Sequence, residues 1–451
     1  MRGIRTDVVQ ALRALKVPNV RWPGGCFADE YHWREGIGPN RPERVNTSWG
    51  GVLEPNTFGT HEFFDFLDQI GSEAYLSVNV GSGTVREAAD WMEYLTADKP
   101  TALAKERAAN GHPSPYKIKY LGLGNENWGC GGSMSADHYV EEMKQYAHYS
   151  RNLNSAQTGT TAMKRIAVGW DSGTDDYTET VMKAWKAHNW AWNIEGVSLH
   201  GYTIPGSWEK KGPSVGFGED EYAKGIRSTL KMKEWVAKQS AIMDRYDPEK
   251  KLGLYVDEWG IWVDPNPGSN PGFLQQQNTV RDAVIAALNL DIFMRNADRV
   301  RGANIAQMVN VLQAMILTDG PKMLLTPTYH IYRMYVPFQG ANIVPVSFDA
   351  GSTSLGEISL PRIDALAARD RSGKVWLSLI NVDPNRPTRI TASIPGARSA
   401  TGQVLTGAAV DSHNSFDQPN AVTPKPFRGV AAKGQLVFDL PPKSVVVVQL
   451  Q

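Results

Sequence analysis

Short apolar runs alternate with helix-like stretches from the start of the chain to about residue 340, and this alternation limits the possible folds more than any other feature. Each run has the length of a buried strand, and the stretches between runs repeat apolar residues at three- and four-residue spacing. Repeated strand–helix units of this kind build a parallel sheet. The expected strands are Asn19–Trp22, Tyr75–Val80, Lys119–Gly124, Arg165–Gly169, Ile194–Leu199, Leu252–Val256 and Asn304–Val309.

The number of expected strands is one short of a closed barrel. A (β/α)8 TIM barrel needs eight strands, and this sequence opens on a helix-like stretch, Arg5–Leu15, that has no strand before it. We therefore expect an α/β chain with a TIM barrel whose first strand is missing from the sequence. Either the native chain is longer, or another segment closes the barrel. Further helices are expected at Thr60–Ile70, Ala136–Asn152, Glu221–Ser240 and Gln275–Asn296.

The texture of the sequence changes after the helix-like stretch Thr328–Tyr335. Short strands separated by Pro, Gly and Asn then predict an antiparallel β-sandwich. The domains are accordingly expected at residues 1–338 for the barrel and 339–451 for the sandwich. The sandwich strands are expected at Val375–Asn381, Arg389–Ser393, Gly402–Leu405, Leu436–Leu440 and Ser444–Gln449, with surface loops at Gly351–Leu355 and within Gly396–Asn420.

Composition and motifs exclude several classes of protein. Lys and Arg together number 47 and so do Asp and Glu, so the basic surplus of a nucleic-acid-binding protein is missing. No apolar run approaches the roughly 20 residues that span a bilayer. Zinc-binding, dinucleotide, P-loop and serine-hydrolase motifs are also missing, so we expect no metal and no cofactor. The start does not read as a signal peptide, so the compartment is expected to be cytoplasmic by default, with export open if the chain is a truncated one.

Polar residues gather where the expected barrel strands end, which is where TIM barrels carry their chemistry. Glu126 and Glu258 each end an apolar strand and each precede a Trp or an Asn-Trp pair. Two carboxyl groups facing one sugar carbon are what glycosidic bond cleavage requires, and a carbohydrate site would also use the 14 Trp and 16 Tyr of the chain. His200 and Tyr202 end another strand and are expected to point to one face, as site residues or as a pair at the barrel rim.

The chain has two cysteines, Cys26 and Cys130. Cys26 follows Pro23-Gly24-Gly25, a tight turn at which the backbone can approach a ligand. A small buried apolar residue is the usual role of a free Cys, so we expect Cys26 to be buried or to contact a ligand. A disulfide to Cys130 stays open as an alternative. Arg21 is expected to hold a carboxylate in its charged form or to pair with an acid at the rim.

Six motifs in order give these residues a resemblance to a known family. They are Val20–Gly25, Trp49-Gly50 with Glu54–Thr60, Gly124–Gly129, Ser198–Tyr202, Asp257–Gly260 and Ala306–Val311. Together they resemble glycoside hydrolase family 51, the α-L-arabinofuranosidases, over nearly the whole chain. The resemblance implies a (β/α)8 barrel with an antiparallel jelly-roll sandwich.

By the same resemblance, Glu126 is the acid/base and Glu258 the nucleophile of a retaining exo-acting α-L-arabinofuranosidase. Asn125 is then expected to bind the furanose 2-hydroxyl, and Tyr202 and His200 to lie next to the nucleophile. The other substrate-binding positions that it implies are Arg21, Cys26, Trp49, Trp128 and Gln307. Retention further implies carboxyl groups about 5–5.5 Å apart, not the roughly 6.5–9.5 Å of inverting enzymes.

The expected substrate is an arabinose-containing oligo- or polysaccharide: arabinoxylan, arabinan or arabino-oligosaccharides. Two alternatives stay open, an endo-acting β-glucanase or xylanase on the same barrel and a non-catalytic sugar-binding protein. Neither nucleic acid nor membrane is an expected partner. The resemblance also implies a homo-oligomer, a hexamer, and family members usually carry a first barrel strand with a substrate-binding Glu.

Overall fold

The computed structural model describes residues 2–170, 176–432 and 434–451. The chain divides into two compact units. The first comprises Met1–His200, Ala237–Glu258 and Asp298–Asn304, and the second comprises Gly201–Val236, Trp259–Ala297 and Ile305–Gln451.

A sheet of seven strands forms the centre of the first unit, within the described residues. Its order is β1 (Asn19–Trp22), β4 (Glu73–Val78), β5 (Tyr120–Leu123), β6 (Lys164–Ala167), β7 (Gly196–Thr203), β8 (Gly253–Ile261) and β9 (Val300–Ile305). Neighbouring strands from β1 to β7 pair in parallel, with Tyr75 opposite both Arg21 and Tyr120. The sheet also curls far enough for Asn304 Nδ2 on β9 to donate a hydrogen bond of 2.8 Å to Asn19 Oδ1 on β1.

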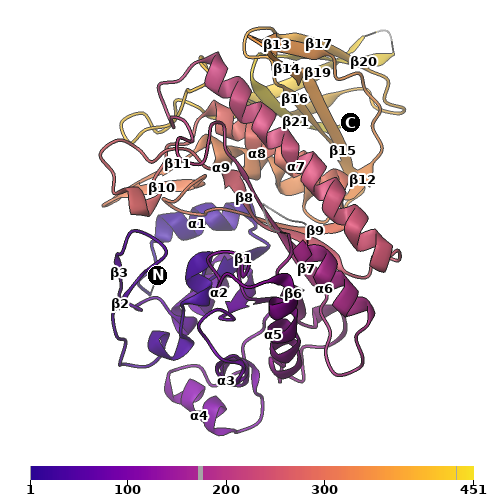
Figure 1. The fold of residues 1–451 in the computed structure, drawn as a ribbon. Helices are drawn as coiled ribbons and strands as arrows, with labels where there is room; N and C mark the ends of the chain where they lie inside the picture. Colours follow the sequence, from indigo (N-terminus) through magenta and orange to yellow (C-terminus); the bar gives the residue numbers. More distant parts are fainter. Residues whose placement is uncertain (1, 171–175, 433) are drawn as a thin grey trace. The chain divides into compact units, whose positions relative to one another are not determined.

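Helices pack on this sheet in the part of the chain drawn from indigo to purple in Figure 1. They are α1 (Thr6–Leu15), α2 (Thr60–Ile70), α3 (Val85–Thr96), α4 (Ala102–Ala109), α5 (Ala136–Tyr149) and α6 (Asp176–Lys186). Several begin where a hydroxyl side chain caps the first turn: Thr84 accepts from Glu87 N, and Ser135 accepts from His138 N. Between β1 and α2 lie a short helix, η1 (Cys26–Asp29), and a small hairpin, β2 (Arg44–Val45) with β3 (Leu53–Glu54).

Eight antiparallel strands form the main sheet of the second unit. Their order is β12 (Asn342–Val344), β15 (Ile363–Arg369), β16 (Val375–Asn381), β21 (Ser444–Leu450), β18 (Ala400–Leu405), β19 (Lys425–Ala432), β20 (Gln435–Leu440) and β17 (Thr388–Ala392). Alternate residues such as Leu377, Leu379, Phe438 and Val446 point into one shared core. The unit also holds α8 (Val280–Arg295), α9 (Pro327–Tyr335) and the hairpins β10–β11 (Ile316–Asp319, Lys322–Leu325) and β13–β14 (Ser352–Leu355, Ile358–Pro361). Helix α7 (Glu219–Tyr246) spans residues of both units.

This architecture confirms the expected fold class, a parallel barrel-type sheet and an antiparallel sandwich. The expected bounds of β1, α2 and β16 are also the observed ones. No helix among the described residues is long and apolar enough to cross a membrane.

Some expectations were wrong. The last barrel strand is Val300–Ile305 instead of Asn304–Val309, because its sequence VRGANI is only half-buried and lacks the apolar texture of the segment after it. The strand Lys425–Ala432 was missed because it is mostly exposed and contains Pro and Gly. The segment Gly351–Leu355, expected as a loop, contains β13.

Candidate active site

Polar side chains from three strands of the parallel sheet and from the turn after a fourth meet in the first unit. Arg21 comes from β1, His200 from β7, and Asp257 and Glu258 from β8. Glu126 lies in the turn that follows β5, where its backbone has a φ of 45°, in the left-handed region that non-glycine residues rarely adopt. Parallel strands place their carboxyl ends at one edge of a sheet, which is why residues so distant in the sequence come together.

The imidazole of His200 lies at the centre of this group. Its Nδ1 is 2.7 Å from Glu126 Oε1 and 3.3 Å from Glu258 Oε2. Its Nε2 is 3.1 Å from Asp257 Oδ1. One carboxylate oxygen of Glu126, one of Glu258 and one ring nitrogen of His200 all lie within 4.8 Å of one another. The two glutamates therefore meet at one ring nitrogen of His200, and Asp257 contacts the other.

Arg21 supplies the second positive charge of the group. Its Nη1 lies 3.4 Å from Glu258 Oε2, its Nε lies 3.7 Å from Asp257 Oδ2, and its Nη2 donates to Asn125 Oδ1. The hydroxyl of Tyr75 on β4 donates a 2.5 Å hydrogen bond to Asp257 Oδ2. Three carboxyl groups thus lie beside two cationic side chains, and Asp257 is also held by the hydrogen bond from Tyr75.

Burial and charge act against each other on His200. Burial alone would lower its pKa, but the carboxylate of Glu258 and the hydrogen bonds to Asp257 and Glu126 raise the pKa to about 10. Burial would raise the pKa of Asp257, yet the hydrogen bond from His200 and the charge of Arg21 keep that pKa below its usual value. His200 is consequently an imidazolium at neutral pH and donates from both ring nitrogens.

Two sets of donor atoms in the described part of the chain are close enough to share a metal ion: Glu126, His200 and Glu258, and Cys26, Glu126 and Cys130. The two cysteine sulfurs are bonded to each other, so the second set offers no thiolate to a metal.

Comparison with known proteins identifies the family. Residues 11–197 match the family described as "Alpha-L-arabinofuranosidase 1 domain", and residues 257–444 match "Alpha-L-arabinofuranosidase C-terminal domain". The crystal structure of the GH51 arabinofuranosidase from Xanthomonas axonopodis pv. citri is 45% identical, with a TM-score of 0.96 over 100% of this chain and 90% of that one. The chain belongs to glycoside hydrolase family 51. This membership confirms the resemblance found in the six motifs and makes the chain a glycoside hydrolase with a carbohydrate substrate.

Other relatives of this family 51 chain agree. The "Intracellular exo-alpha-L-arabinofuranosidase" of Bacteroides ovatus is 43% identical over 100% of this chain and 87% of its own length. An α-L-arabinofuranosidase from Thermotoga maritima, solved as an arabinose complex, is 29% identical with a TM-score of 0.84, over 99% of this chain and 90% of that one.

Most of the predicted site residues lie in the first unit of the family 51 chain. Arg21, Asn125, Glu126, His200 and Glu258 form the group described above. Trp128 is half-buried and follows Glu126 by two residues. Trp49 is half-buried too, and its backbone N–H donates to Asn46 Oδ1 in the loop of the β2–β3 hairpin.

Tyr202 and Gln307 belong to the second unit. Tyr202 is half-buried and its ring packs edge-on against Trp262, with centroids 5.0 Å apart. Gln307 is exposed and lies after β9, not within it as expected. Their relation to the carboxylate pair stays a prediction.

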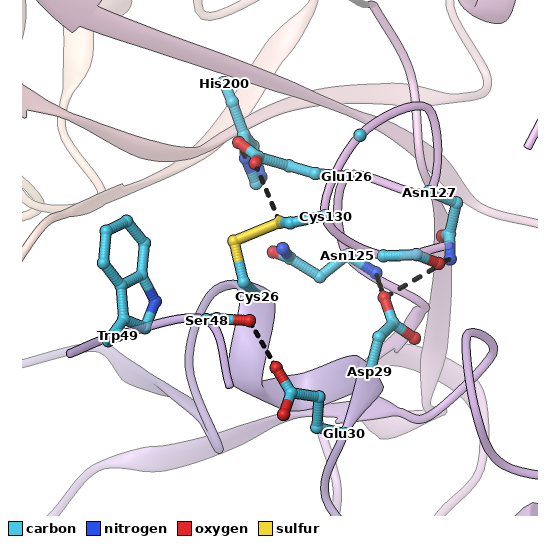
Figure 2. The surroundings of a disulfide bond; sticks show 12 residues. Cys26, Asp29, Glu30, Ser48, Trp49, Asn125, Glu126, Asn127, Cys130 and His200 are labelled. Carbon is cyan, nitrogen blue, oxygen red and sulfur yellow. Dashed lines mark hydrogen bonds and ion pairs between the residues drawn. A yellow bond between two sulfur atoms is a disulfide. The ribbon is translucent and has the colours of Figure 1, made fainter. Parts of the chain in front are cut away.

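Cys26 is not the free cysteine that the sequence favoured. It forms a disulfide with Cys130, the pairing left open as an alternative, and the two Cα atoms are 5.5 Å apart (Figure 2). The bond closes a long stretch of chain because β1 and β5 both flank β4, so the loops that follow them become neighbours. Two isolated cysteines 104 residues apart carry no signal of this proximity.

Three polar residues of the site were missed from the sequence: Asp29, Tyr75 and Asp257. Asp257 directly precedes Glu258 on β8, so an acid next to the expected nucleophile was a usable signal. Tyr75 lies in the middle of the apolar stretch of β4 and reads as core. Asp29 is the last residue of the short helix η1, and nothing in the local sequence distinguishes it from a surface acid.

Proposed function

We propose that this chain is a retaining exo-acting α-L-arabinofuranosidase in which Glu258 is the nucleophile and Glu126 is the acid/base. The observation that carries the proposal is the approach of these two carboxylates to within 4.8 Å. That separation suits a double displacement, because an inverting mechanism needs room for a water between the carboxyl groups. The name of the Bacteroides ovatus relative and the arabinose in the Thermotoga maritima structure support the choice of sugar.

The reaction runs in two steps. Glu258 attacks the anomeric carbon while Glu126 protonates the leaving oxygen, so the glycosidic bond breaks as a glycosyl-enzyme ester forms. Glu126, now a carboxylate, then deprotonates a water that releases arabinose and restores Glu258. Arg21 and His200 offset the negative charge of Glu258, the proposed nucleophile.

Asn125 is proposed to bind the 2-hydroxyl of the furanose. Its side chain is buried, its Oδ1 accepts from Arg21, and its Nδ2 has no hydrogen-bond partner among the described residues. A buried amide donor without a partner is costly, and a sugar hydroxyl would satisfy it. Trp49 and Trp128 are proposed as pocket walls, Tyr202 as a donor to Glu258, and Gln307 and the disulfide sulfur of Cys26 as sugar contacts.

The proposed substrates are arabinoxylan, arabinan and arabino-oligosaccharides. We also propose that the catalytic barrel covers residues 1–338 and the sandwich covers residues 339–451, and that the chain assembles into a homo-oligomer, a hexamer.

Release of the aryl group from 4-nitrophenyl α-L-arabinofuranoside tests the proposal, with proton NMR following the anomeric configuration of the first product. We expect rapid release and an α-configured arabinose before mutarotation. Glu258→Ala should abolish turnover, and normal turnover in that variant would end the assignment.

Other results would point to other functions. Release of sugar only from polymers would favour an endo-acting glucanase or xylanase. Saturable binding of arabino-oligosaccharides without any release would favour a sugar-binding protein. A β-configured first product would contradict the double displacement while keeping the glycosidase.

A further inference from the structure

The short helix η1 (Cys26–Asp29) is tied at both of its ends to the loop that carries Glu126. Cys26 is bonded to Cys130, and Asp29 accepts a hydrogen bond from the backbone of Asn125 (Figure 2). The two ties therefore meet the loop on either side of Glu126.

Asp29 acts as a junction between three segments. Its Oδ1 accepts from Val80 N at 2.7 Å and Gly81 N at 2.9 Å, at the end of β4. Its Oδ2 accepts from Asn125 N at 2.7 Å and from Asn127 Nδ2 at 3.3 Å. The side chain is buried, with 3% of the residue exposed, so water cannot replace these bonds.

The disulfide holds the other side of the loop. Cys130 Sγ lies 3.4 Å from Glu126 Oε2, and since a disulfide sulfur has no proton this is a packing contact, not a hydrogen bond. Cys26 is buried and Cys130 is exposed. The bond thus supports the Glu126 carboxyl group and is open to thiol reagents from the Cys130 side.

Glu126 needs such support because of its backbone. A φ of 45° is unfavourable for a residue with a Cβ, and such a conformation persists only where the surroundings enforce it. The loop is also packed so closely that a Cβ added at Gly131 would lie 2.5 Å from Asp29 Oδ2. Asp29 and the disulfide are therefore placed to keep Glu126 in its unusual conformation.

We propose that Asp29 is a positioning residue for proton transfer by Glu126, and that the Cys26–Cys130 disulfide is its covalent counterpart. This inference rests on the proposed function, because it assigns to both groups the task of aiming the acid/base. Neither group needs to touch the substrate for this role. If the proposal holds, replacing Asp29 or reducing the disulfide slows most those substrates whose leaving group must be protonated.

The test compares kcat/KM for two substrates that differ in their need for a proton, 4-nitrophenyl and phenyl α-L-arabinofuranoside. Asp29→Asn should lower kcat/KM for the phenyl substrate about tenfold more than for the 4-nitrophenyl one, because a misplaced acid matters most for a poor leaving group. A merely structural loss would lower both values by the same factor.

Asp247→Asn is the control for the loss of a buried acid. Asp247 accepts a backbone N–H from Leu252 at 2.8 Å and also pairs with Arg299 Nη1 at 2.9 Å. Among the described residues, no hydrogen bond or ion pair joins it to the carboxylates of the site. It should leave the ratio of the two kcat/KM values unchanged. If the ratio of the two kcat/KM values changes by the same factor in Asp29→Asn and in Asp247→Asn, the proposal is wrong.

Reduction of the wild-type chain with a phosphine provides a second arm that does not depend on how well Asp29→Asn folds. The chain has two cysteines, both in this bond, so any specific effect of the reductant comes from it. Reduction should increase the ratio of kcat/KM for the 4-nitrophenyl substrate to kcat/KM for the phenyl substrate. The double variant Cys26→Ser/Cys130→Ser should show this larger ratio without reductant, and reductant should not change it further.

The possible failures are distinguishable. A wild-type chain that cleaves neither substrate contradicts the proposed function itself. An active wild-type chain whose substrate ratio is unmoved by reduction and by Asp29→Asn contradicts the positioning role alone.

Discussion

The Nδ1 of His200 lies 2.7 Å from Oε1 of Glu126, so a buried cation is in direct contact with the proposed acid/base. The same nitrogen is 3.3 Å from Glu258 Oε2, and the ring reaches Asp257 through its other nitrogen. The stability of the folded chain should therefore depend on the protonation of His200.

This link predicts how stability depends on pH. The pKa of His200 rises from 6.5 to about 10 in the folded chain, so its stabilising contribution is complete below about pH 6.5 and is lost as the pH rises through about 10. The groups that face it are Glu126, Asp257, Glu258 and, beyond them, Arg21. Denaturant unfolding of the wild-type chain and of His200→Asn between pH 6 and 10.5 checks this. The wild-type chain should lose more stability over that range, and parallel curves would contradict the assignment.

Azide should distinguish the roles of the two glutamates. In Glu126→Ala the glycosyl-enzyme formed from an activated substrate lacks a base, and azide, which needs none, should restore turnover and give the α-arabinofuranosyl azide. In Glu258→Ala, azide takes the place of the nucleophile and should give the β-azide. NMR of the two products is the measurement, and the same anomer from both variants would contradict the assigned roles.

Gly25 approaches the proposed nucleophile closely. A Cβ at this position would lie 3.3 Å from Glu258 Oε1, so Gly25→Ala must displace the carboxylate by a few tenths of an ångström. We expect kcat/KM to fall about tenfold, since small misplacements of reacting groups are costly.

Gly24→Ala is the neighbouring control for that substitution. Apart from Gly24 itself and its two chain neighbours, no described residue has an atom within 4 Å of a Cβ at Gly24, but the φ of Gly24 is 126°. The change should therefore cost about 1–3 kcal/mol of stability with less effect on kcat/KM. A larger loss of kcat/KM in Gly24→Ala than in Gly25→Ala would show that contact with Glu258 does not determine the loss of activity.

Arg107 provides a prediction away from the site. This buried side chain, 1% exposed, donates to five backbone carbonyls, those of Tyr94, Leu95, Ala97, His112 and Pro113. Arg107→Met removes the guanidinium donor from all five carbonyls, although that of Leu95 keeps a hydrogen bond from Tyr116 N, so we expect a loss on the order of 3–5 kcal/mol in the free energy of unfolding. At temperatures where the variant stays folded, kcat should be close to that of the wild-type chain.

The sequence predicted those parts of the fold that have a strong hydrophobic period. Thr60–Ile70 and Val375–Asn381 were expected with their observed bounds because buried apolar residues define them. Asn19–Trp22 was also expected with its observed bounds, although its four residues are only half-buried. The strand Val300–Ile305 was misplaced because Arg301 and Asn304 interrupt its apolar pattern, and one of them serves as a side-chain bridge to β1 instead of as core.

The sequence likewise predicted some residues of the candidate site and missed others. Glu126 and Glu258 stand out because they are charged residues at the ends of apolar runs. The roles of Asp29, Tyr75 and the Cys26–Cys130 bond depend on which strands are neighbours in the sheet, and no local pattern carries that information. His200 was expected near the site, but its contact with three carboxylates required the three-dimensional arrangement.

The left-handed backbone at Glu126 makes thermal stability and catalytic activity favour different residues at this one position. Glycine adopts this conformation freely, so Glu126→Gly is expected to be inactive yet to melt at a higher temperature than the wild-type chain. Selection for heat resistance alone would then discard the very residue on which turnover depends.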